Sequence, residues 1–471
     1  MSRYTSATDA DREAMLEAIG AGSVEELFAD IPADLRLGQP LELADGLSET
    51  EVFDRLAELA ARNADADSET CFIGAGMYDH YVPAVVEAII SRSEFLTPYT
   101  PYQPEVSQGG LQVMFEFQTA ISELTGLPVA NASLYEGPSS VASAAYLALG
   151  AGKGRRRLVV SRGLHPHARA TLETYSRGFG AEVVEVGLEE GLTDADELAG
   201  ALDERTAAIF VQNPNFLGAI EDLERLAAAA HDAGALCVAS VDAITLGVLR
   251  PPGECGVDVA VGEGQPLGNR LDFGGPSFGF FAATSEHLRR MPGRIAGETT
   301  DADGRRGFVL ALQTREQHIR REKATHNICT SQALNALAGT IYLAWLGRRG
   351  IVELGELLVR RTAYARERLA AVDGVEPLHE APVAREFAVR LDAPVAEVVD
   401  RVSEEGIAAG YPLGRDFPEY GDGLLVAITE RRSREDIDRL ADALGRAIPA
   451  ARRAFVSDSE TRTQVAEEVG G

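Results

Sequence analysis

The chain has 471 residues, 45% of them hydrophobic, which is enough to build more than one packed core. Its 73 acidic and 44 basic residues give a formal net charge of −29, which argues against a nucleic-acid partner because phosphates would be repelled. Only Lys153 and Lys323 are lysines, and this acidic composition is typical of a strongly hydrated, halophilic-type surface.

The four cysteines, Cys71, Cys237, Cys255 and Cys329, lie far apart without paired spacing, so we expect free thiols and no bound metal. The first residues are polar and acidic, which argues against a signal peptide. No apolar run approaches the roughly 20 residues that a membrane helix needs. We therefore expect a cytoplasmic enzyme or enzyme subunit that contacts no membrane.

The first 70 residues read as an N-terminal helical arm. Apolar residues recur at helical spacing over residues 8–19 and 49–62, and proline-containing loops separate the two segments. Because such short helices bury little on their own, we expect the arm to pack on another domain or subunit.

A proline-rich stretch follows, FLTPYTPYQPEVSQG, over residues 95–109. Its three prolines fix the backbone and remove amide donors, which predicts an ordered extended loop rather than a helix or a central strand. The aromatic, hydroxyl, amide and carboxyl groups of this loop suit a small polar ligand or planar cofactor, although a plain surface connector is an equally good interpretation. The candidate active-site residues of the loop are Tyr99, Thr100, Tyr102, Gln103, Glu105 and Gln108. An amphipathic helix is predicted next, over residues 110–125.

From residue 158 the pattern alternates between strands and helices, which predicts a mostly parallel sheet covered on both faces, in a large α/β domain over residues 71–335. Ligands of such sheets bind at the carboxyl ends of strands, where His165 and Asp242 lie. Ser139 and Ser140 open an Ala-rich helix and could hold an anion, although Ser139 is as readily an ordinary N-cap. The predicted strands cover residues 158–161, 183–186, 208–212, 236–241, 259–262 and 278–283.

The C-terminal third predicts a smaller α+β domain over residues 336–456. Two long helices, 325–345 and 351–372, precede strands 386–391 and 424–429, between which a helix is expected at 394–405. A last helix is predicted at 434–447, and the polar residues 457–471 are expected to form a flexible tail.

Together these features resemble the fold-type I, aspartate-aminotransferase-like enzymes that use pyridoxal phosphate. The resemblance implies that Ser139 and Ser140 bind the cofactor phosphate, that His165 stacks on the ring, and that Asp242 pairs with the pyridinium nitrogen. That fold also needs a lysine in the turn GEGQPLGNRLDFGGP, between the fifth and sixth strands, to hold the cofactor as an imine. The turn contains no lysine, and Gln265 stands at its expected position.

Longer segments resemble the N-terminal-half (alpha) subunits of two-chain glycine dehydrogenases (decarboxylating, aminomethyl-transferring), the P-proteins of the glycine cleavage system. They include GAGMYDHYVPAVV, LTPYTPYQPEVSQGGLQVMFEFQTAISELTG, VQNPNFLGAIED, GEGQPLGNRLDFGGPSFGF and TREQHIRREKATHNICTSQALNAL. The resemblance implies a beta-chain partner (subunit 2) that binds pyridoxal phosphate covalently through its own lysine, within an alpha2beta2 heterotetramer.

The same resemblance implies an activity. The complex decarboxylates glycine, releases CO2 and transfers the aminomethyl group to the lipoyl arm of H-protein. The loop Tyr99 to Gln108 is expected to reach that shared site, and the resemblance leaves open whether Ser139, Ser140, His165 and Asp242 still touch a cofactor or are vestigial. Two alternatives remain: a self-contained aminotransferase or decarboxylase that uses Lys323, and a non-catalytic scaffold.

Overall fold

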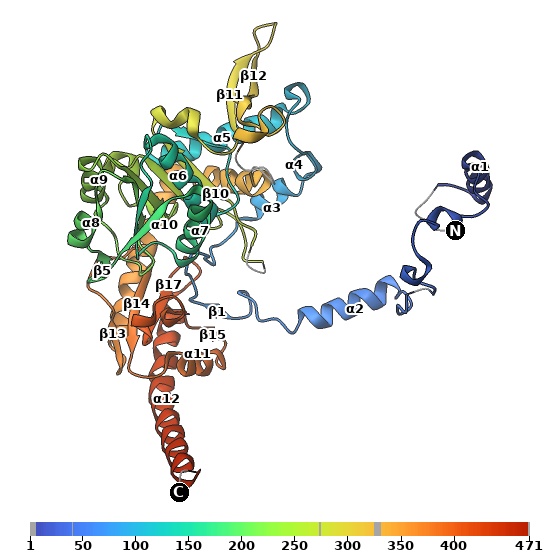
Figure 1. Cartoon of the computed structure of the whole chain (residues 1–471). Helices are drawn as coiled ribbons and strands as arrows, with labels where there is room; N and C mark the ends of the chain where they lie inside the picture. Colours follow the sequence, from blue (N-terminus) through green and yellow to red (C-terminus); the bar gives the residue numbers. More distant parts are fainter. Residues whose placement is uncertain (1–5, 40, 273–274, 325–330, 470–471) are drawn as a thin grey trace. The chain divides into compact units, whose positions relative to one another are not determined.

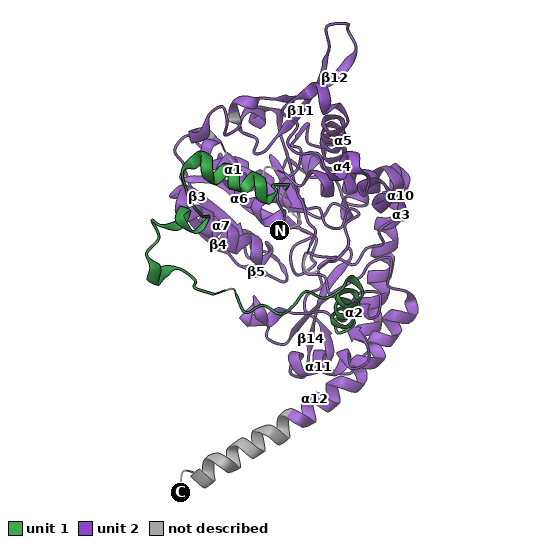
Figure 2. Cartoon of the chain, turned by 90° about the vertical axis from the view of Figure 1, so that its right-hand side faces the viewer, with its two compact units in different colours: residues 1–64 green, residues 65–471 purple. Residues whose placement is uncertain are grey.

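The computed structural model describes residues 6–39, 41–272, 275–324 and 331–469. The chain forms two compact units, residues 1–64 and residues 65–471 (Figure 2). The fold of each unit is described separately below.

The first unit contains the two helices that the sequence predicts. Helix α1 (Asp9–Ile19) begins with a capping box between Thr8 and Asp11, and α2 (Glu49–Ala60) with one between Ser48 and Glu51. Short 3-10 turns, η1 (Glu25–Phe28) and η2 (Ala33–Leu35), lie between them. The described residues of this unit bury no side chain, and its apolar residues are largely exposed. The two helices therefore form where their capping signals predict them, although they bury no core of their own.

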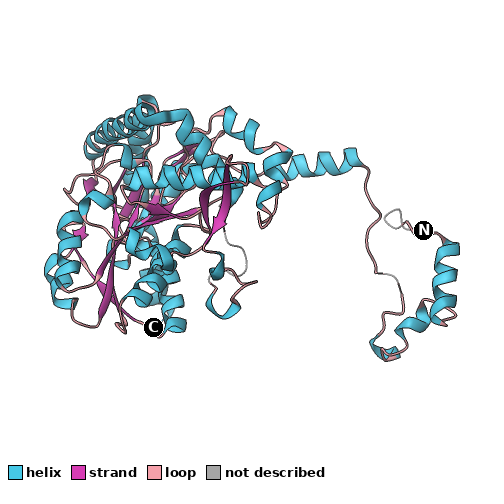
Figure 3. Cartoon of the chain, turned by 90° about the horizontal axis from the view of Figure 1, so that it is seen from above, coloured by secondary structure: helices cyan, strands magenta, loops and turns pink. Residues whose placement is uncertain are grey.

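A seven-stranded sheet in the order β2-β10-β9-β8-β7-β3-β4 is the centre of the second unit (Figures 1 and 3). Five neighbouring strands are parallel, and β10 runs antiparallel to both β9 and β2. All six strands expected from the sequence are present, and β2 is added at the edge. The strands are β2 (Val129–Ala130), β3 (Arg157–Ser161), β4 (Glu182–Val186), β7 (Thr206–Asn213), β8 (Leu236–Val241), β9 (Val259–Glu263) and β10 (Gly279–Ala283).

Helices cover both faces of this sheet because successive strand residues point to opposite sides. Ile209 and Val211 belong to one buried cluster with residues of α5, α9 and α10, whereas Ala208 and Phe210 belong to another with residues of α6 and α7. The α/β class is thereby confirmed. The covering helices are α5 (Gln108–Thr125), α6 (Gly137–Ala151), α7 (Pro166–Phe179), α8 (Ala195–Ala201), α9 (Leu223–Asp232) and α10 (Ala333–Ala370).

The C-terminal residues build a second sheet, in the order β13-β14-β17-β16, around a core of its own. Helix α10 combines the two helices expected at 325–345 and 351–372, joined at Gly347, where φ is 62°; residues 325–330 lie outside the described part. A domain boundary at residue 335 and a flexible tail stay predictions. The elements are β13 (Val375–Pro377), β14 (Glu386–Leu391), α11 (Val395–Ser403), β16 (Tyr411–Pro412), β17 (Gly423–Ala427) and α12 (Arg434–Val469).

Three features were not expected from the sequence. A hairpin of β11 (Ile295–Thr300) and β12 (Arg306–Ala311) extends from the large sheet region (Figure 1). Strand β1 (Thr70–Cys71) pairs with β15 (Ile407–Ala408), and α12 continues to Val469 instead of ending at residue 447. The remaining short elements are α3 (Ala84–Ile90), α4 (Ser93–Leu96), η3 (Pro104–Val106), β5 (Leu188–Glu189), β6 (Leu192–Thr193), η4 (Thr245–Gly247), η5 (Pro252–Cys255), η6 (Ser285–Arg290), η7 (Gln313–Arg315), η8 (Arg321–Lys323), η9 (Leu413–Arg415) and η10 (Pro418–Tyr420).

Within the described ranges, no helix is both long and apolar enough to span a lipid bilayer.

Candidate functional site

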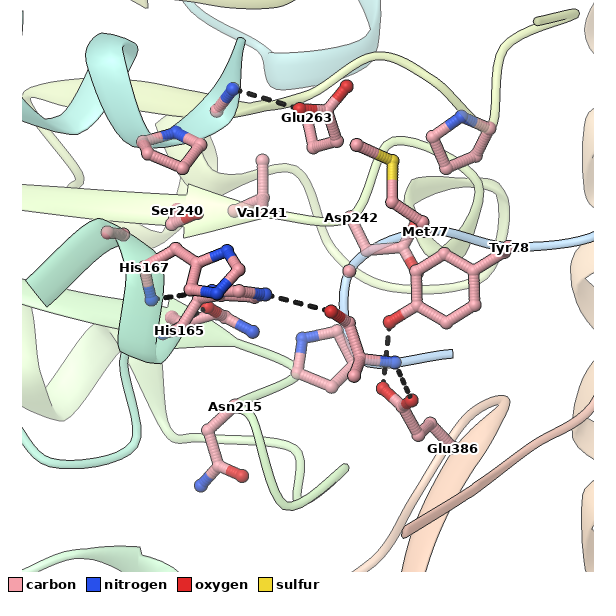
Figure 4. A pocket seen from close by; sticks show the side chains of 18 of the residues that line it. Met77, Tyr78, His165, His167, Asn215, Ser240, Val241, Asp242, Glu263 and Glu386 are labelled. Atoms are coloured by element: carbon pink, nitrogen blue, oxygen red, sulfur yellow. Dashed lines mark hydrogen bonds between the residues drawn. The ribbon is translucent and has the colours of Figure 1, made fainter. Parts of the chain in front are cut away.

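A cavity of about 380 Å³ lies at the carboxyl ends of β3, β7, β8 and β9, where the sequence places the ligand site (Figure 4). His165 and Asp242 both line it, as expected. The remaining wall comes from residues 75–78, from residues 136–138 at the start of α6, and from Arg385 and Glu386 at the start of β14. The site therefore combines segments that are distant in sequence.

The wall segment 74–78 passes very close to its neighbours. At Gly76, where φ is +101°, an added Cβ would lie 2.7 Å from Nε2 of His165, and at Gly74 it would collide with Glu386. Between these glycines, the amide of Ala75 donates to Oε1 of Glu386 at 2.7 Å. Glycine is needed at both positions so that the chain can pass between a histidine and a buried glutamate.

His165 is fixed at both ring nitrogens. It is the N-cap of α7, its Nδ1 accepts from the amide of His167 at 3.1 Å, and its Nε2 lies 2.8 Å from the carbonyl oxygen of Ala75. A ring that accepts at Nδ1 must carry its proton on Nε2, so the histidine is neutral. Burial lowers the pKa of His165 to about 4.

The N-terminus of α6 is capped by a carboxylate, not by a serine. Oε1 of Glu136 accepts from the amide of Ser139 at 2.9 Å and also from its hydroxyl. The Ser140 hydroxyl donates to the Glu136 carbonyl at 2.9 Å. The prediction that Ser139 is the N-cap is wrong, because the longer Glu136 side chain reaches the same amide from three residues before it.

A second carboxylate, that of Glu263, lies at the same helix end. Its Oε2 accepts from the amide of Gly137 at 3.0 Å, and its Oε1 accepts from the amide of Gln265 at 2.8 Å and the hydroxyl of Ser277 at 2.5 Å. Burial raises the pKa of Glu263, and these donors oppose that shift. The place where a helix start binds an external anion is thus filled by a side chain of the protein.

Asp242 pairs with a buried arginine. Nε of Arg385, whose side chain is 3% exposed, lies 2.5 Å from Oδ2 of Asp242. The guanidinium carbon stacks 3.4 Å from the centre of the Tyr78 ring, and Nη1 lies 2.5 Å from Nε2 of His80. A planar cation therefore pairs with Asp242 in the cavity wall.

Glu386, next to this arginine, is buried. Its Oε2 accepts from the Tyr78 hydroxyl at 2.7 Å. Burial raises the pKa of Glu386 to about 7, against the opposing pull of the Ala75 amide and of Arg385. Glu386 is therefore a carboxyl group at this wall that titrates near neutral pH.

Gln265 is completely buried and turns away from the cavity. Its Oε1 accepts from the amide of Tyr78 at 2.9 Å, and its Nε2 donates to the carbonyl oxygens of Tyr78 at 3.1 Å and of Asn269 at 2.7 Å. A carboxamide can accept and donate on one face of a peptide group, which a lysine cannot do.

Lys153 does not replace it. Lys153 precedes β3, at the amino end of a parallel strand, whereas the cavity lies at the carboxyl ends. The backbone of Lys323 belongs to η8, and its side chain lies outside the described part of the chain.

The proline-rich loop lies elsewhere in the second unit. None of its candidate residues is among those that line the described cavity. Gln108 anchors the loop to β12, because its Nε2 donates to the Phe308 carbonyl at 2.8 Å and its Oε1 accepts from the Phe308 amide at 2.8 Å. Tyr99, by contrast, is 92% exposed. The expectation of an extended loop without helix is only partly correct, because α4 (Ser93–Leu96) and η3 (Pro104–Val106) form helical turns within it and α5 already begins at Gln108.

Tyr102 joins the loop to a second segment. Its ring contacts His318 edge to face with centroids 4.5 Å apart, and the guanidinium carbon of Arg294 lies 5.7 Å from it. Arg294 is itself within 3.3 Å of Glu316, and its Nη2 donates to the Thr100 hydroxyl at 3.5 Å. Gln103 and Glu105 flank this contact and are exposed. The loop and residues 313–318 therefore form one surface.

Sequence reasoning missed the residues that fill the pocket. Glu386 opens the strand predicted at 386–391 and Arg385 directly precedes it, and nothing in a strand pattern shows that these residues reach the end of another sheet. Tyr78 and Glu263 lie within the motifs GAGMYDH and GEGQP, so their segments were singled out but their roles were not.

The family model "Glycine cleavage system P-protein" matches residues 2–444. The chain belongs to the glycine cleavage system P-protein family. It is 50% identical over 443 residues to "Probable glycine dehydrogenase (decarboxylating) subunit 1" of Carboxydothermus hydrogenoformans, which covers 94% of this chain and 99% of the relative. It is 47% identical over 443 residues to the protein of that name in Halalkalibacterium halodurans, with coverage of 94% and 99%.

Solved structures agree with this P-protein assignment. A crystal structure described as glycine decarboxylase (P-protein) of the glycine cleavage system, in inhibitor-bound form, is 45% identical, has a TM-score of 0.85, and covers 95% of this chain and 100% of its own. A sphingosine-1-phosphate lyase from Burkholderia pseudomallei shares the fold alone, at 17% identity, a TM-score of 0.66 and coverage of 92% and 98%. The fold-type I architecture of pyridoxal phosphate enzymes is thereby confirmed.

The pocket of this P-protein family member does not fit pyridoxal phosphate itself. Gln265 stands where the resemblance places the amine, and two carboxylates cover the helix start that would hold the phosphate. Arg385 covers the carboxylate that would pair with the ring nitrogen. Each of the three anchor points is already used by the chain.

Proposed function

We propose that this chain is subunit 1 of a two-chain P-protein and that it decarboxylates glycine only together with a lysine-bearing subunit 2. The observation that carries the proposal is the buried carboxamide of Gln265, at the position between β9 and β10 where the fold needs an amine. The relatives named subunit 1 support the same division of labour.

In this proposal pyridoxal phosphate is bound covalently by the partner, where it supplies an electron sink for the carbanion that glycine leaves on loss of CO2. The aminomethyl group then passes to the lipoyl arm of H-protein. The chains assemble as an alpha2beta2 heterotetramer in the cytoplasm, with the N-terminal unit packed on a partner. The exposed apolar side chains of α1 and α2 support that role, since a helix that buries nothing alone gains most from a partner.

This chain contributes the proline-loop surface, which we define as Tyr99, Thr100, Tyr102, Arg294 and His318. Gln108 and the three prolines hold this surface rigid, so little conformational entropy is lost when it meets a partner. Tyr99 presents a ring and a hydroxyl to solvent. On docking, these aromatic groups can exclude water from the partner's site and orient the glycine carboxylate beside the hydroxyls.

The test compares the purified chain with the mixed subunits. The chain alone with pyridoxal phosphate should exchange no label between CO2 and glycine carboxylate, and borohydride should fix no pyridoxyl group in the turn at residue 265. Adding subunit 2 should restore exchange. Exchange by the chain alone, or a pyridoxyl peptide at Lys323, would establish a self-contained enzyme instead.

A scaffold role is separated by Tyr99→Ala and Tyr102→Ala. We expect complexes that assemble to the normal mass but exchange label at least about tenfold more slowly, because an interface aromatic is worth on the order of 2 kcal/mol. Exposed Val106→Ala, in the same loop, is the matched control. Full exchange by assembled tyrosine variants would show that the surface serves assembly only.

A further inference from the structure

Two charged side chains hold the points at which a phosphorylated pyridine cofactor would be bound. Helix N-termini bind phosphate, and a carboxylate beside the pyridine nitrogen keeps it protonated. In this pocket the first point is the start of α6, which Glu263 occupies (Figure 4). The second is Asp242, which pairs with Arg385.

Glu263 accepts the hydrogen bonds that an external anion would otherwise accept at this helix start. Its two oxygens accept from three donors, the amides of Gly137 and Gln265 and the hydroxyl of Ser277. Three donors aimed at one carboxyl group favour its ionised form and satisfy it without water. An incoming phosphate would displace it from these donors and would also meet Glu136, which holds the amide of Ser139.

Arg385 likewise replaces a planar ring cation. Its guanidinium is flat and delocalised, its Nε lies 2.5 Å from Oδ2 of Asp242, and it stacks on the Tyr78 ring at 3.4 Å. Its Nη1 meets His80, whose Nδ1 lies 2.6 Å from Oε2 of Glu430. The cation is therefore held from two sides, and a competing ring would have to break both contacts.

We propose that Glu263 and Arg385 are built-in substitutes for the phosphate and the ring cation of such a cofactor, so that the pocket is closed to phosphorylated pyridines by occupancy and not only by its missing lysine. The inference goes beyond the proposed function, since it concerns this chain's own pocket and holds whichever protein is the partner.

The first experiment uses pyridoxamine 5′-phosphate, which needs no lysine, and the full-length chain in calorimetric titration. The wild type should bind no more than Glu380→Ser, a control that removes the same charge from an exposed site. Glu263→Ser frees three donors and should tighten binding at least about tenfold. Glu263→Gln, which keeps the side-chain shape, covers the case in which the serine variant fails to fold and should also bind more tightly than the control.

The second experiment separates occupancy from the missing amine. Gln265→Lys alone, treated with pyridoxal phosphate and borohydride, should remain unlabelled at position 265, whereas the triple variant with Glu263→Ser and Arg385→Leu should be labelled there. Equal labelling of both would overturn the proposal, because the absent amine would then be the whole barrier. So would wild-type binding of pyridoxamine phosphate as tight as that of Glu263→Ser.

Discussion

The side chain of Gln265 pairs with the main chain of Tyr78 through two hydrogen bonds, of 2.9 and 3.1 Å. This pairing joins the turn after β9 to the segment that walls the pocket. The residue that replaces the expected lysine is thus a structural link between two parts of the site.

Gln265→Leu should lower the free energy of unfolding by about 3 kcal/mol, because it leaves a buried amide and two carbonyl groups without their partner. Urea denaturation followed by circular dichroism measures the loss. Gln112→Leu is the matched control, since Gln112 is exposed on α5 and its side chain donates to Glu116 on the same helix; it should change stability by less than about 0.5 kcal/mol. Equal effects of the two substitutions would contradict the assigned role.

Arg385→Met should destabilise the chain by about 3 kcal/mol, because it leaves the partly buried carboxylate of Asp242 without its cation. The double variant with Asp242→Asn should recover part of that loss. A double-mutant cycle by chemical denaturation gives the coupling energy. Strict additivity of the two substitutions would show that the ion pair does not stabilise the fold.

His165→Asn should make the free energy of unfolding depend less steeply on pH in the acid range. The folded-state pKa of about 4 lies below the ordinary value of 6.5, so the unfolded chain binds more protons between these values. The contribution of neutral His165 to the free energy of unfolding is therefore complete above pH 6.5. It falls by up to about 3 kcal/mol as the pH is lowered toward 4. Thermal denaturation from pH 4 to pH 8 measures it.

The experiment must compare the pH dependence of stability in the variant with that in the wild type, because the titration of Glu386 changes the free energy of unfolding in the opposite direction. Its pKa is raised to about 7, so its contribution falls as pH rises from 4.5 to 7. His167→Asn, at an exposed position on the same helix, is the control and should keep the wild-type slope. If the dependence of stability on pH were the same in His165→Asn as in the wild type, His165 would be ruled out as the cause of that dependence.

Gln108→Ala should loosen the proline-rich loop from the β11–β12 hairpin. It removes bonds to both main-chain groups of Phe308, which should cost about 2 kcal/mol and slow turnover of the assembled enzyme by more than the loss of folded chain explains. Gln103→Ala, at an exposed position in the same loop, should leave stability unchanged. Hydrogen exchange of residues 97–107 reports the loosening directly.

The central sheet was predictable because its strands are short, nearly continuous apolar runs between helices with clear N- and C-terminal signals. The strands over residues 236–241 and 259–262 illustrate this, since nearly every residue in them is buried. The two-residue strands β1, β2 and β15 carry no such pattern, because their pairing depends on neighbours far along the chain.

The candidate site also has a part that could be predicted from the sequence and a part that could not. His165 and Asp242 were predictable because parallel strand ends meet at one edge. The residues that contact them were not predictable. Arg385 lies 143 positions from Asp242 in the sequence, and a contact between side chains so far apart leaves no local pattern. The N-cap was misassigned for a subtler reason: Ser139 is an ordinary capping residue, and only the folded geometry shows Glu136 reaching its amide.

A pocket filled by its own side chains gives this chain an unusual independence. A ligand that binds only the folded state adds to stability by mass action, so most proteins of this architecture become more resistant to unfolding as their vitamin B6 supply rises. With Glu263 and Arg385 in place, this chain should mature and persist equally well in starved and in supplemented cells. Nutrient shortage would then limit the assembled enzyme only through the other subunit.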